Sequence, residues 1–526
     1  MPNLRRPIVL APLAAVAVLA IAVPSAVAMA GGSLSGSGLA DGAVLNATSL
    51  ETRTLEITAD GVDAKSIKAT IDGRPARVSR QGAGWVVGLA GLKDGQHTVE
   101  VSAPKSFVGS ASLTRHVTVD TTPPALTVTT PDKPVKIRDA VEVAGTVEKD
   151  AKVTADGGKL TLNGTAFTVH YDAPPASAKI VATDAAGNAT ERLVTVPTAY
   201  PTNIRGVHMT GAAWAYAPLR NPVLQLIKEK RINAVQLDIK DEDGVVNYLS
   251  QVPLAKAAGA PFKYFDAKQA TDELHGLGVR VIGRIVAFND PKLTDYALAH
   301  GHKDWVIQNP DGSKYLYGYN KHGFSNFANP EVRKYNRDLA VEAVKAGFDD
   351  VVYDYVRRPD GKLAGMRFPG LKGDPQDSIA SFLQETQAQI RPLGGSLGAA
   401  AFAQASTRPG DTSQNIPKMA KYLDVVIPMD YPSHWNPGEY GVPDPYVGAY
   451  DIVHRSLKDW LKAVKGTNCV VVPWLQDENY KGVYTADKVL QQIRGTRDNG
   501  IPGWLMWSAG ARYTAAAYST DATPAR

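Results

Sequence analysis

Asp349-Asp350-Val351-Val352-Tyr353-Asp354-Tyr355-Val356-Arg357-Arg358-Pro359 is the stretch that decides the fold of this chain. Residues of high β-propensity surround one acid, Asp354, and a proline ends the run, which predicts a buried strand. Asp354 then shares a face with Val352 and Val356, while Tyr353 and Tyr355 point the other way. An unpaired buried carboxylate is unfavourable. Either Arg357 or Arg358 pairs with it, or it is a catalytic group at the carboxyl end of a barrel strand.

The sequence from Arg205 onward supplies the other strands of such a barrel. Buried runs alternate with amphipathic stretches such as 222–230, 265–277, 330–346, 378–391 and 486–499. This alternation predicts a TIM (β/α)8 barrel over residues 201–515, followed by a tail at 516–526. A doubly wound sheet is the alternative, but no glycine-rich phosphate loop follows the first strand. Besides the opening stretch, the predicted strands are 205–209, 234–240, 279–286, 396–402, 425–430, 470–474 and 503–508.

The second predicted strand shows which face of the barrel is polar. Ala234, Gln236, Asp238 and Lys240 share one face, and apolar residues occupy the other. We expect the polar face to point to the barrel axis, as an active site at the mouth requires.

The chain before residue 201 has a different pattern, with short alternating strands and frequent turns such as Asp72-Gly73 and Asp94-Gly95. No amphipathic helix competes, which predicts two β-sandwiches, 39–120 and 121–200. The Thr122-Pro123-Pro124 break and the turn at 184–188 resemble the immunoglobulin-like modules of secreted bacterial proteins. That resemblance implies a spacer, or a module that binds carbohydrate or cell wall.

The first residues are typical of export. Arg5 and Arg6 precede an apolar run at 8–23, and small residues at 26–30 suit a cleavage site, so residues 1–30 are a predicted signal peptide. We expect a secreted or cell-surface protein; the alternative is an uncleaved N-terminal membrane anchor. Residues 31–38, rich in glycine and serine, are a predicted flexible tether. Cys469 is the single cysteine, so no intramolecular disulfide can form.

Composition excludes several classes of function. The formal net charge of +5, without any run of basic residues, argues against nucleic-acid binding. The histidines are scattered and no His-Glu-x-x-His or Cys/His spacing occurs, so we expect no metal and no cofactor. The absence of Gly-x-Ser-x-Gly argues against a serine esterase. We expect a monomer.

Acids and aromatic residues gather where the predicted strands end. Several strands that end in carboxylates on one rim predict an acid-lined cleft, and flat rings beside such acids are typical of a site for sugar rings. The acids are Asp238, Asp241, Asp290, Asp354, Asp430, Asp477 and Glu478, and the aromatic residues are Tyr355, Tyr431, Trp435, Trp474, Trp504 and Trp507.

Six ordered motifs, which begin at Ile239, Gly283, Tyr353, Pro428, Pro473 and Gly503, resemble the bacterial putative glycoside hydrolase domain family, a TIM-barrel group first described as a domain of unknown function. The resemblance covers residues 205–511 and implies glycosidase activity on a polysaccharide. The sequence departs from the family at Arg358, where the family carries an aromatic residue.

Glycoside cleavage needs two carboxyl groups beside the scissile bond. We predict Asp354 as nucleophile or transition-state stabiliser, kept ionised by Arg357, and Asp430 as general acid. Asp238, with Lys240 as its partner, is the rival to Asp430. Arg284 is predicted to order the carboxylates or to bind a substrate anion. The other predicted substrate-binding residues are Asp241, Arg357, Tyr355, Tyr431, His434, Trp435, Trp474, Gln476, Trp504 and Trp507.

The sequence therefore predicts an exported glycoside hydrolase that acts on a polysaccharide of the cell surface or the surroundings. The alternative is a catalytically silent wall- or glycan-binding protein that uses the cleft and the immunoglobulin-like modules.

Overall fold

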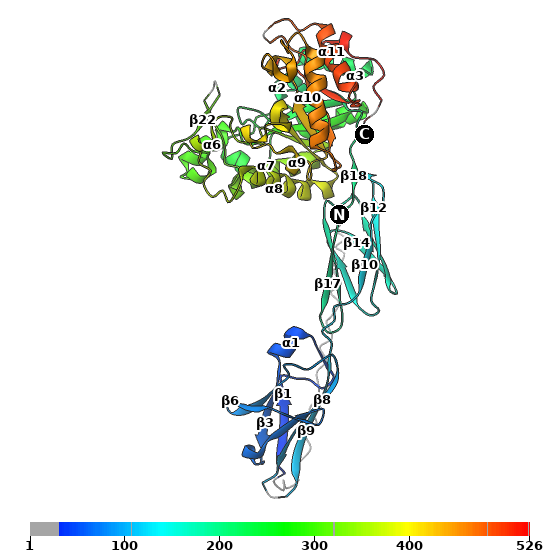
Figure 1. The fold of residues 1–526 in the computed structure, drawn as a ribbon, viewed down its shortest axis with the longest axis vertical. Helices are drawn as coiled ribbons and strands as arrows, with labels where there is room; N and C mark the ends of the chain where they lie inside the picture. Colours follow the sequence, from blue (N-terminus) through cyan, green and yellow to red (C-terminus); the bar gives the residue numbers. More distant parts are fainter. Residues whose placement is uncertain (1–30, 107, 319–320, 481, 524, 526) are drawn as a thin grey trace, which may run out of the picture. The chain divides into compact units, whose positions relative to one another are not determined.

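The computed structural model describes residues 31–106, 108–318, 321–480, 482–523 and 525; the predicted signal peptide, residues 1–30, lies outside them. The chain divides into two compact units. One holds the residues up to Pro124 with Thr183–Ala189, and the other holds Ala125–Ala182 and the residues from Thr190 onward. Figure 1 shows the change from a region built mainly of strands to one of alternating strands and helices. No helix in the described ranges has the length and apolar character needed to cross a bilayer.

The first unit contains two sheets that share one apolar core. The sheet orders are β1-β3-β7-β6 and β2-β9-β8-β4-β5, and the core includes Leu55, Val87, Val99 and Val117. The predicted tether is wrong, because β1 pairs antiparallel with β3 along its whole length. The elements are β1 (Ser33–Ser37), β2 (Ala43–Leu45), α1 (Ala47–Thr52), β3 (Thr54–Asp60), β4 (Lys68–Ile71), β5 (Arg74–Ala76), β6 (Val78–Gln81), β7 (Gly84–Gly88), β8 (Gly95–Pro104) and β9 (Ser110–Val119).

The second β-rich region, from residue 126 to residue 199, also has its own core, which includes Val143, Val169 and Ile180. Its sheets are β10-β12-β15-β14, β13-β16-β17 and the short pair β11-β18. The N-terminal part of the chain is therefore β-rich as predicted, and its likeness to immunoglobulin modules stays a prediction. The strands are β10 (Leu126–Thr129), β11 (Val135–Lys136), β12 (Val141–Val147), β13 (Lys152–Ala155), β14 (Lys159–Asn163), β15 (Ala166–Tyr171), β16 (Ala178–Thr183), β17 (Ala189–Val194) and β18 (Thr198–Ala199).

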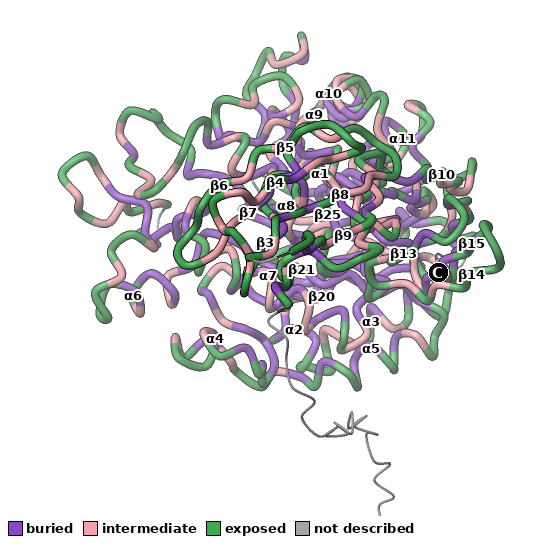
Figure 2. The backbone as a smooth tube through the Cα atoms, turned by 90° about the horizontal axis from the view of Figure 1, so that it is seen from below, coloured by how far each residue is buried: buried purple, intermediate pink, exposed green. Residues whose placement is uncertain are grey.

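The remaining residues form the predicted closed parallel barrel. Strands pair in chain order, and a pairing of β19 with β29 closes the ring. Every residue of β20 and β21 is buried, and Figure 2 shows such interior segments in the buried colour. The strands are β19 (Arg205–Met209), β20 (Ala234–Lys240), β21 (Arg280–Val286), β24 (Asp350–Asp354), β25 (Ser396–Phe402), β26 (Val425–Met429), β27 (Val470–Val471) with β28 (Trp474–Gln476), and β29 (Trp504–Trp507).

Helices follow most of these strands and begin at the caps that their sequences supply. Asn329, for example, accepts the backbone N–H groups of Glu331 and Val332, and Pro330 occupies the first helical position. The helices are α2 (Gly211–Ala215), α3 (Ala217–Lys228), α4 (Pro253–Ala257), α5 (Ala267–Gly276), α6 (Pro291–Ala299), α7 (Pro330–Lys345), α8 (Pro375–Ile390), α9 (Ile416–Met419), α10 (Ala449–Ala463) and α11 (Ala486–Arg497); a short hairpin, β22 (Leu316–Tyr317) and β23 (His322–Gly323), follows α6.

The barrel has two apolar layers. Inward residues such as Ala234, Ile282, Val352 and Ala400 pack around the axis. Outward residues such as Val351 pack beneath the helices in a much larger cluster. The face predicted for Val352 is therefore the inward one.

Two predictions about the barrel are wrong in detail. The seventh strand is interrupted, because Pro473 has no N–H for the ladder and separates β27 from β28. The predicted tail is packed: Tyr518 and Ala525 are buried, and the Asp521 carboxylate lies 2.6 Å from the Arg205 guanidinium.

Candidate active site

Asp354 ends β24 and lies on the inward face, as the strand period predicts. Its Oδ2 accepts hydrogen bonds from Arg284 Nε at 3.0 Å and Nη2 at 2.6 Å, and its Oδ1 accepts one from the backbone N–H of Tyr355 at 2.7 Å. Tyr355 has φ 49°, a left-handed conformation that non-glycine residues rarely adopt. The chain therefore leaves the strand just after the acid, and Tyr355 lines the pocket instead of pointing the other way as predicted.

Arg284, from β21, connects three carboxylates beneath the mouth of the barrel. Besides Asp354, it contacts Glu242 through Nη2 and Asp238 through Nη1, the latter at 3.0 Å. Its guanidinium carbon lies 5.7 Å and 5.4 Å from the ring centres of Trp474 and Trp507. Burial lowers the pKa of Arg284, but the three carboxylates outweigh burial and raise the pKa well above its usual value.

Asp238 lies at the bottom of this network and is fully buried. Its Oδ1 accepts from Arg284 and also contacts His208 Nε2 at 2.9 Å, whereas its Oδ2 has no partner among the described residues. Burial raises the pKa of Asp238, but the charges of His208 and Arg284 outweigh it and hold the pKa below its usual value. Asp238 is thus placed to hold Arg284 rather than to meet a substrate.

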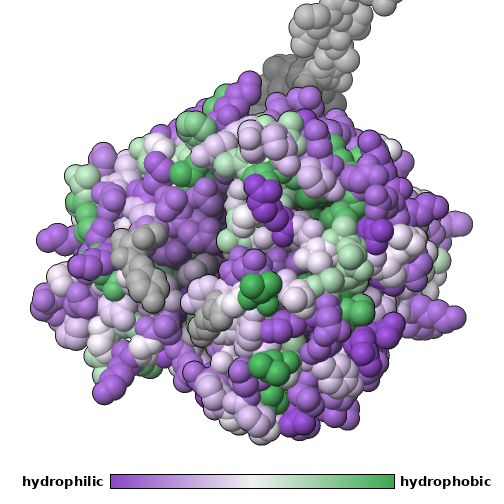
Figure 3. Space-filling view, turned by 90° about the horizontal axis from the view of Figure 1, so that it is seen from above, coloured by the Kyte–Doolittle hydropathy of each residue, from purple (hydrophilic) through white to green (hydrophobic). Residues whose placement is uncertain are grey.

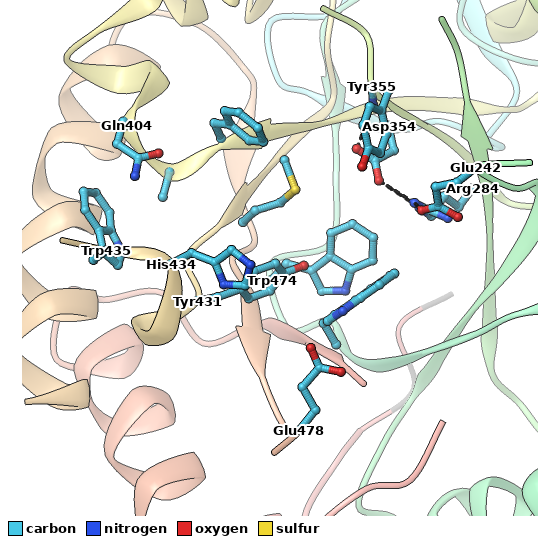
Figure 4. A pocket seen from close by; sticks show the side chains of 14 residues that line it. Glu242, Arg284, Asp354, Tyr355, Gln404, Tyr431, His434, Trp435, Trp474 and Glu478 are labelled. Carbon is cyan, nitrogen blue, oxygen red and sulfur yellow. Dashed lines mark hydrogen bonds and ion pairs between the residues drawn. The ribbon is translucent and has the colours of Figure 1, made fainter. Parts of the chain in front are cut away.

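A pocket of about 320 Å³ opens above this network at the carboxyl ends of the strands. Figure 4 shows Asp354 directed towards Arg284, and Glu478 on the other side of Trp474 and Tyr431. Glu478 Oε2 accepts the backbone N–H of Ala509 at 2.8 Å. The pocket is lined by Glu242, Arg284, Asp354, Tyr355, Phe402, Ala403, Gln404, Met429, Tyr431, His434, Trp435, Trp474, Glu478 and Trp507.

Comparisons with known proteins bear on this barrel. A family model described as putative glycosyl hydrolase domain matches residues 206–513. The chain belongs to this family. The resemblance that the six motifs indicate is therefore confirmed, and residues 206–513 are a putative glycosyl hydrolase domain. Family membership supports a glycan-cleaving role in general terms.

Three solved structures resemble the chain only distantly, each with a TM-score below 0.5. A hypothetical protein from Ruminiclostridium thermocellum is 27% identical, with 37% of this chain and 96% of that chain covered and a TM-score of 0.33. The PgaB (BpsB) glycoside hydrolase domain from Bordetella bronchiseptica is 15% identical, with coverage of 59% and 94% and a TM-score of 0.44. The catalytic domain 2 of Ostrinia furnacalis group II chitinase is 13% identical, with coverage of 59% and 90% and a TM-score of 0.35. No curated protein matches the chain.

Asp430 does not lie where the sequence places it in the glycosyl hydrolase domain. It follows the last residue of β26 and is fully buried, outside the pocket lining. Trp435 Nε1 donates to its Oδ1 at 2.9 Å, and the Ser456 hydroxyl of α10 donates to its Oδ2. Burial raises the pKa of Asp430 to about 7, although both hydrogen bonds lower it. The acid faces helix α10 because the strand period ends with β26.

Lys240 and Arg357 do not make the pairings that the sequence suggested. A bulge lies between Asp238 and Lys240, and the Lys240 Nζ bonds Asp290, the N-cap of α6, at 2.6 Å and Asn336 of α7 at 3.0 Å. Arg357 lies behind Tyr355, with its guanidinium carbon 4.6 Å from that ring centre. Arg284 makes the ion pair with Asp354 in its place.

Four other predicted residues lie at or below the rim rather than in the pocket lining. Arg358 holds neighbouring loops together, because its guanidinium donates hydrogen bonds to the carbonyls of Pro359, Gly361 and Gly410. The remaining three are Asp241, which caps a turn, Gln476, which accepts the N–H of Ser433, and Trp504, whose ring packs against Tyr518 at 5.0 Å.

Six residues of the lining received no catalytic or substrate-binding role from the sequence: Glu242, Phe402, Ala403, Gln404, Met429 and Glu478. Glu242 and Glu478 each stand two residues beyond the end of a strand, β20 and β28. The sequence feature that could identify both acids is their position just after a strand end. The sequence analysis used it to predict Glu478 as a rim acid but did not include Glu242.

Figure 3 shows one face of the molecule as mainly hydrophilic, with hydrophobic residues in small separate groups. Among the described residues, no group of three or more His, Cys, Asp or Glu side chains is arranged to hold a metal ion.

Proposed function

We propose that the barrel mouth is the active site of an exported glycoside hydrolase that cleaves a polysaccharide of the cell surface or the surroundings. The observation that carries the proposal is the placement of Asp354 and Glu478 on either side of an aromatic-lined pocket. Two carboxyl groups that flank a sugar-sized cavity are the arrangement that glycoside hydrolysis requires.

Asp354 takes the role of nucleophile or transition-state stabiliser. Two hydrogen bonds from Arg284 and one from a backbone N–H fix the orientation of its carboxyl group. A carboxylate held in one orientation by a buried arginine is suited to face the developing positive charge at the anomeric carbon.

Glu478 takes the role of general acid, in place of Asp430. Among the described residues, no basic side chain lies within ion-pair distance of its carboxyl group. It can therefore exchange a proton with a leaving group without first breaking a salt bridge. Glu242 is less suited to this role because its carboxyl group already forms an ion pair with Arg284.

Asp430 and Asp238 act from behind the pocket in this scheme. Asp430 holds the Trp435 indole, which lines the pocket. Asp238 holds the guanidinium that orients Asp354. Trp474, Trp507 and Tyr431 supply the apolar surface against which the C–H face of a pyranose packs.

The test is release of reducing ends from a panel of polysaccharides by the mature chain. We expect at least one polysaccharide to be cleaved, and Asp354→Asn to remove most of the turnover. The matched control is Asp243→Asn, an acid outside the lining whose side chain is 73% exposed and which should keep full activity. A polysaccharide that binds in pull-down but is never cleaved would overturn the proposal in favour of a glycan-binding protein.

A further inference from the structure

The guanidinium of Arg284 has few free N–H donors for a substrate. Its Nε, Nη1 and Nη2 all donate to protein carboxylates, and Nη2 contacts both Glu242 and Asp354. An arginine has five N–H donors in a fixed plane, and here four of them are already in use. The side chain is only 1% exposed. A sugar carboxylate therefore cannot be recognised by this arginine.

The charges that surround Arg284 are unbalanced. Three carboxylates, Asp238, Glu242 and Asp354, contact one guanidinium, and Glu478 adds another acid across the pocket. His208 contacts Asp238 on the side away from the pocket. Besides Arg284, the basic residue in the lining is His434, which is exposed at the rim. Arg357 adds one positive charge behind Tyr355, so four carboxylates still outnumber two guanidinium groups, and the pocket carries an excess of negative charge.

Glu242 is the acid of this group that has no part in the proposed chemistry. Its Oε1 contacts Arg284, its Oε2 has no partner among the described residues, and its side chain is 39% exposed. An open carboxylate oxygen beside a sugar site is an acceptor for an ammonium group.

On the basis of the proposed function, we propose that this pocket selects its sugar by charge. It binds a hexosamine with a free amine best, with the ammonium group against Glu242, binds neutral sugars less tightly, and excludes uronic acids. The attraction of one unit charge at a few ångströms changes affinity by about tenfold or more at an effective dielectric constant of about 20. The negative carboxylate of a uronic acid would be repelled by the same acids. The Arg284 guanidinium could not compensate, because it already pairs with protein carboxylates.

The test uses sugars that the enzyme cannot cleave. Dissociation constants of the mature chain are measured for 1-deoxy sugars in the gluco and galacto configurations, each as the 2-amine, the neutral sugar and the uronic acid. The solutions are at pH 7.0, in low salt and again in 0.5 M salt. The same set is measured with Glu242→Gln and with Asp243→Asn, which removes the neighbouring charge outside the pocket.

We expect the amine to bind about tenfold or more tightly than the uronate, with the neutral sugar between them. Glu242→Gln and high salt should reduce that ratio several-fold, and Asp243→Asn should leave it unchanged. Uronate binding equal to or tighter than neutral-sugar binding would overturn the charge selection while leaving the proposed function intact. An unchanged ratio in Glu242→Gln would overturn the role of Glu242, and failure of every sugar to bind would overturn the proposed function itself.

Discussion

At the scale of single residues, Asp430 is a buried acid whose ionisation is linked to folding. Its pKa is raised to about 7 in the folded chain because it is buried, and it returns to about 3.9 in the unfolded chain. The folded state therefore holds a proton that the unfolded state releases. This contribution to stability is complete below about pH 4 and is lost as the pH rises through about 7.

Asp430→Asn should accordingly flatten the dependence of stability on pH. We expect the free energy of unfolding of the wild type to fall by about 3 kcal/mol more than that of the variant between pH 4.5 and pH 8. Urea unfolding of both proteins at several pH values measures this dependence of the free energy of unfolding on pH. Asp241, whose pKa burial also raises to about 7, is present in both proteins and cancels in the comparison. Identical slopes would show that Asp430 is not the titrating group.

Arg284 is predicted to support the fold as well as the site. Arg284→Met should lower the free energy of unfolding by about 3–5 kcal/mol, because it leaves Asp238 buried with one partner fewer. Arg455→Met, which removes a 43% exposed arginine that bonds Asp451 at 2.9 Å on α10, is the control and should lose about 1 kcal/mol or less. Denaturant unfolding compares the two; losses of the same size would contradict the central position given to Arg284.

The sequence correctly predicts which face a side chain lies on only while the residue stands within a regular strand. Val352 and Asp354 lie on the expected face because both stand within β24. Tyr355, Asp430 and Lys240 do not, because the chain turns after Asp354, β26 ends at Met429, and a bulge precedes Lys240. Alternation of side chains is a property of regular strands and ends where they end. The partner of Asp354, Arg284, comes from another strand, and a contact across strands requires the barrel register.

At the scale of elements, the C-terminal segment is a part of the barrel. The Tyr518 hydroxyl donates to Asp477, Asn233 Nδ2 donates to the carbonyl of Thr523 at 2.6 Å, and the Ala522 N–H bonds the carbonyl of Lys230 at 2.9 Å. The sequence predicted a tail because this segment has no regular period. Hydrogen bonds from irregular backbone and single side chains leave no periodic signal.

Truncation after Thr514 should therefore destabilise the glycosyl hydrolase domain by several kcal/mol, since it exposes the Trp504 ring and removes the Tyr518 partner of buried Asp477. Tyr518→Phe, which removes only the hydroxyl, should lose about 1–2 kcal/mol. Thermal unfolding of the two variants beside the wild type checks both values. A truncated chain with the wild-type melting temperature would mean that the segment is dispensable.

At the scale of the whole molecule, most of the second β-rich region belongs to the same compact unit as the barrel, and only Thr183–Ala189 belong to the other unit. Arg138 pairs with Asp349 at 2.9 Å, and Thr198 bonds Asp424 at 3.3 Å, so residues on both sides of 200 share buried polar contacts. The change in sequence pattern near residue 200 marks a change of architecture within this unit.

A fragment that begins at residue 201 should be less stable than one that begins at 125. Removal of the β-rich region leaves buried Asp349 and Asp424 with fewer partners, which predicts a loss of about 1–3 kcal/mol. Calorimetry of the two fragments gives the answer. Equal melting temperatures would show that the β-rich region adds nothing to the barrel.

The central claim is that Asp354 and Glu478 act as a pair, and leaving-group dependence tests it most directly. Initial rates are measured on a polysaccharide that the wild type cleaves and on an aryl glycoside with an activated leaving group. Glu478→Gln should lower the rate on the polysaccharide by about 100-fold or more and the rate on the aryl glycoside only slightly, because only the leaving group of the polysaccharide needs protonation. Asp354→Asn should lose activity on both substrates. The account is contradicted if Asp430→Asn shows the leaving-group signature and Glu478→Gln does not, or if Asp354→Asn keeps its turnover.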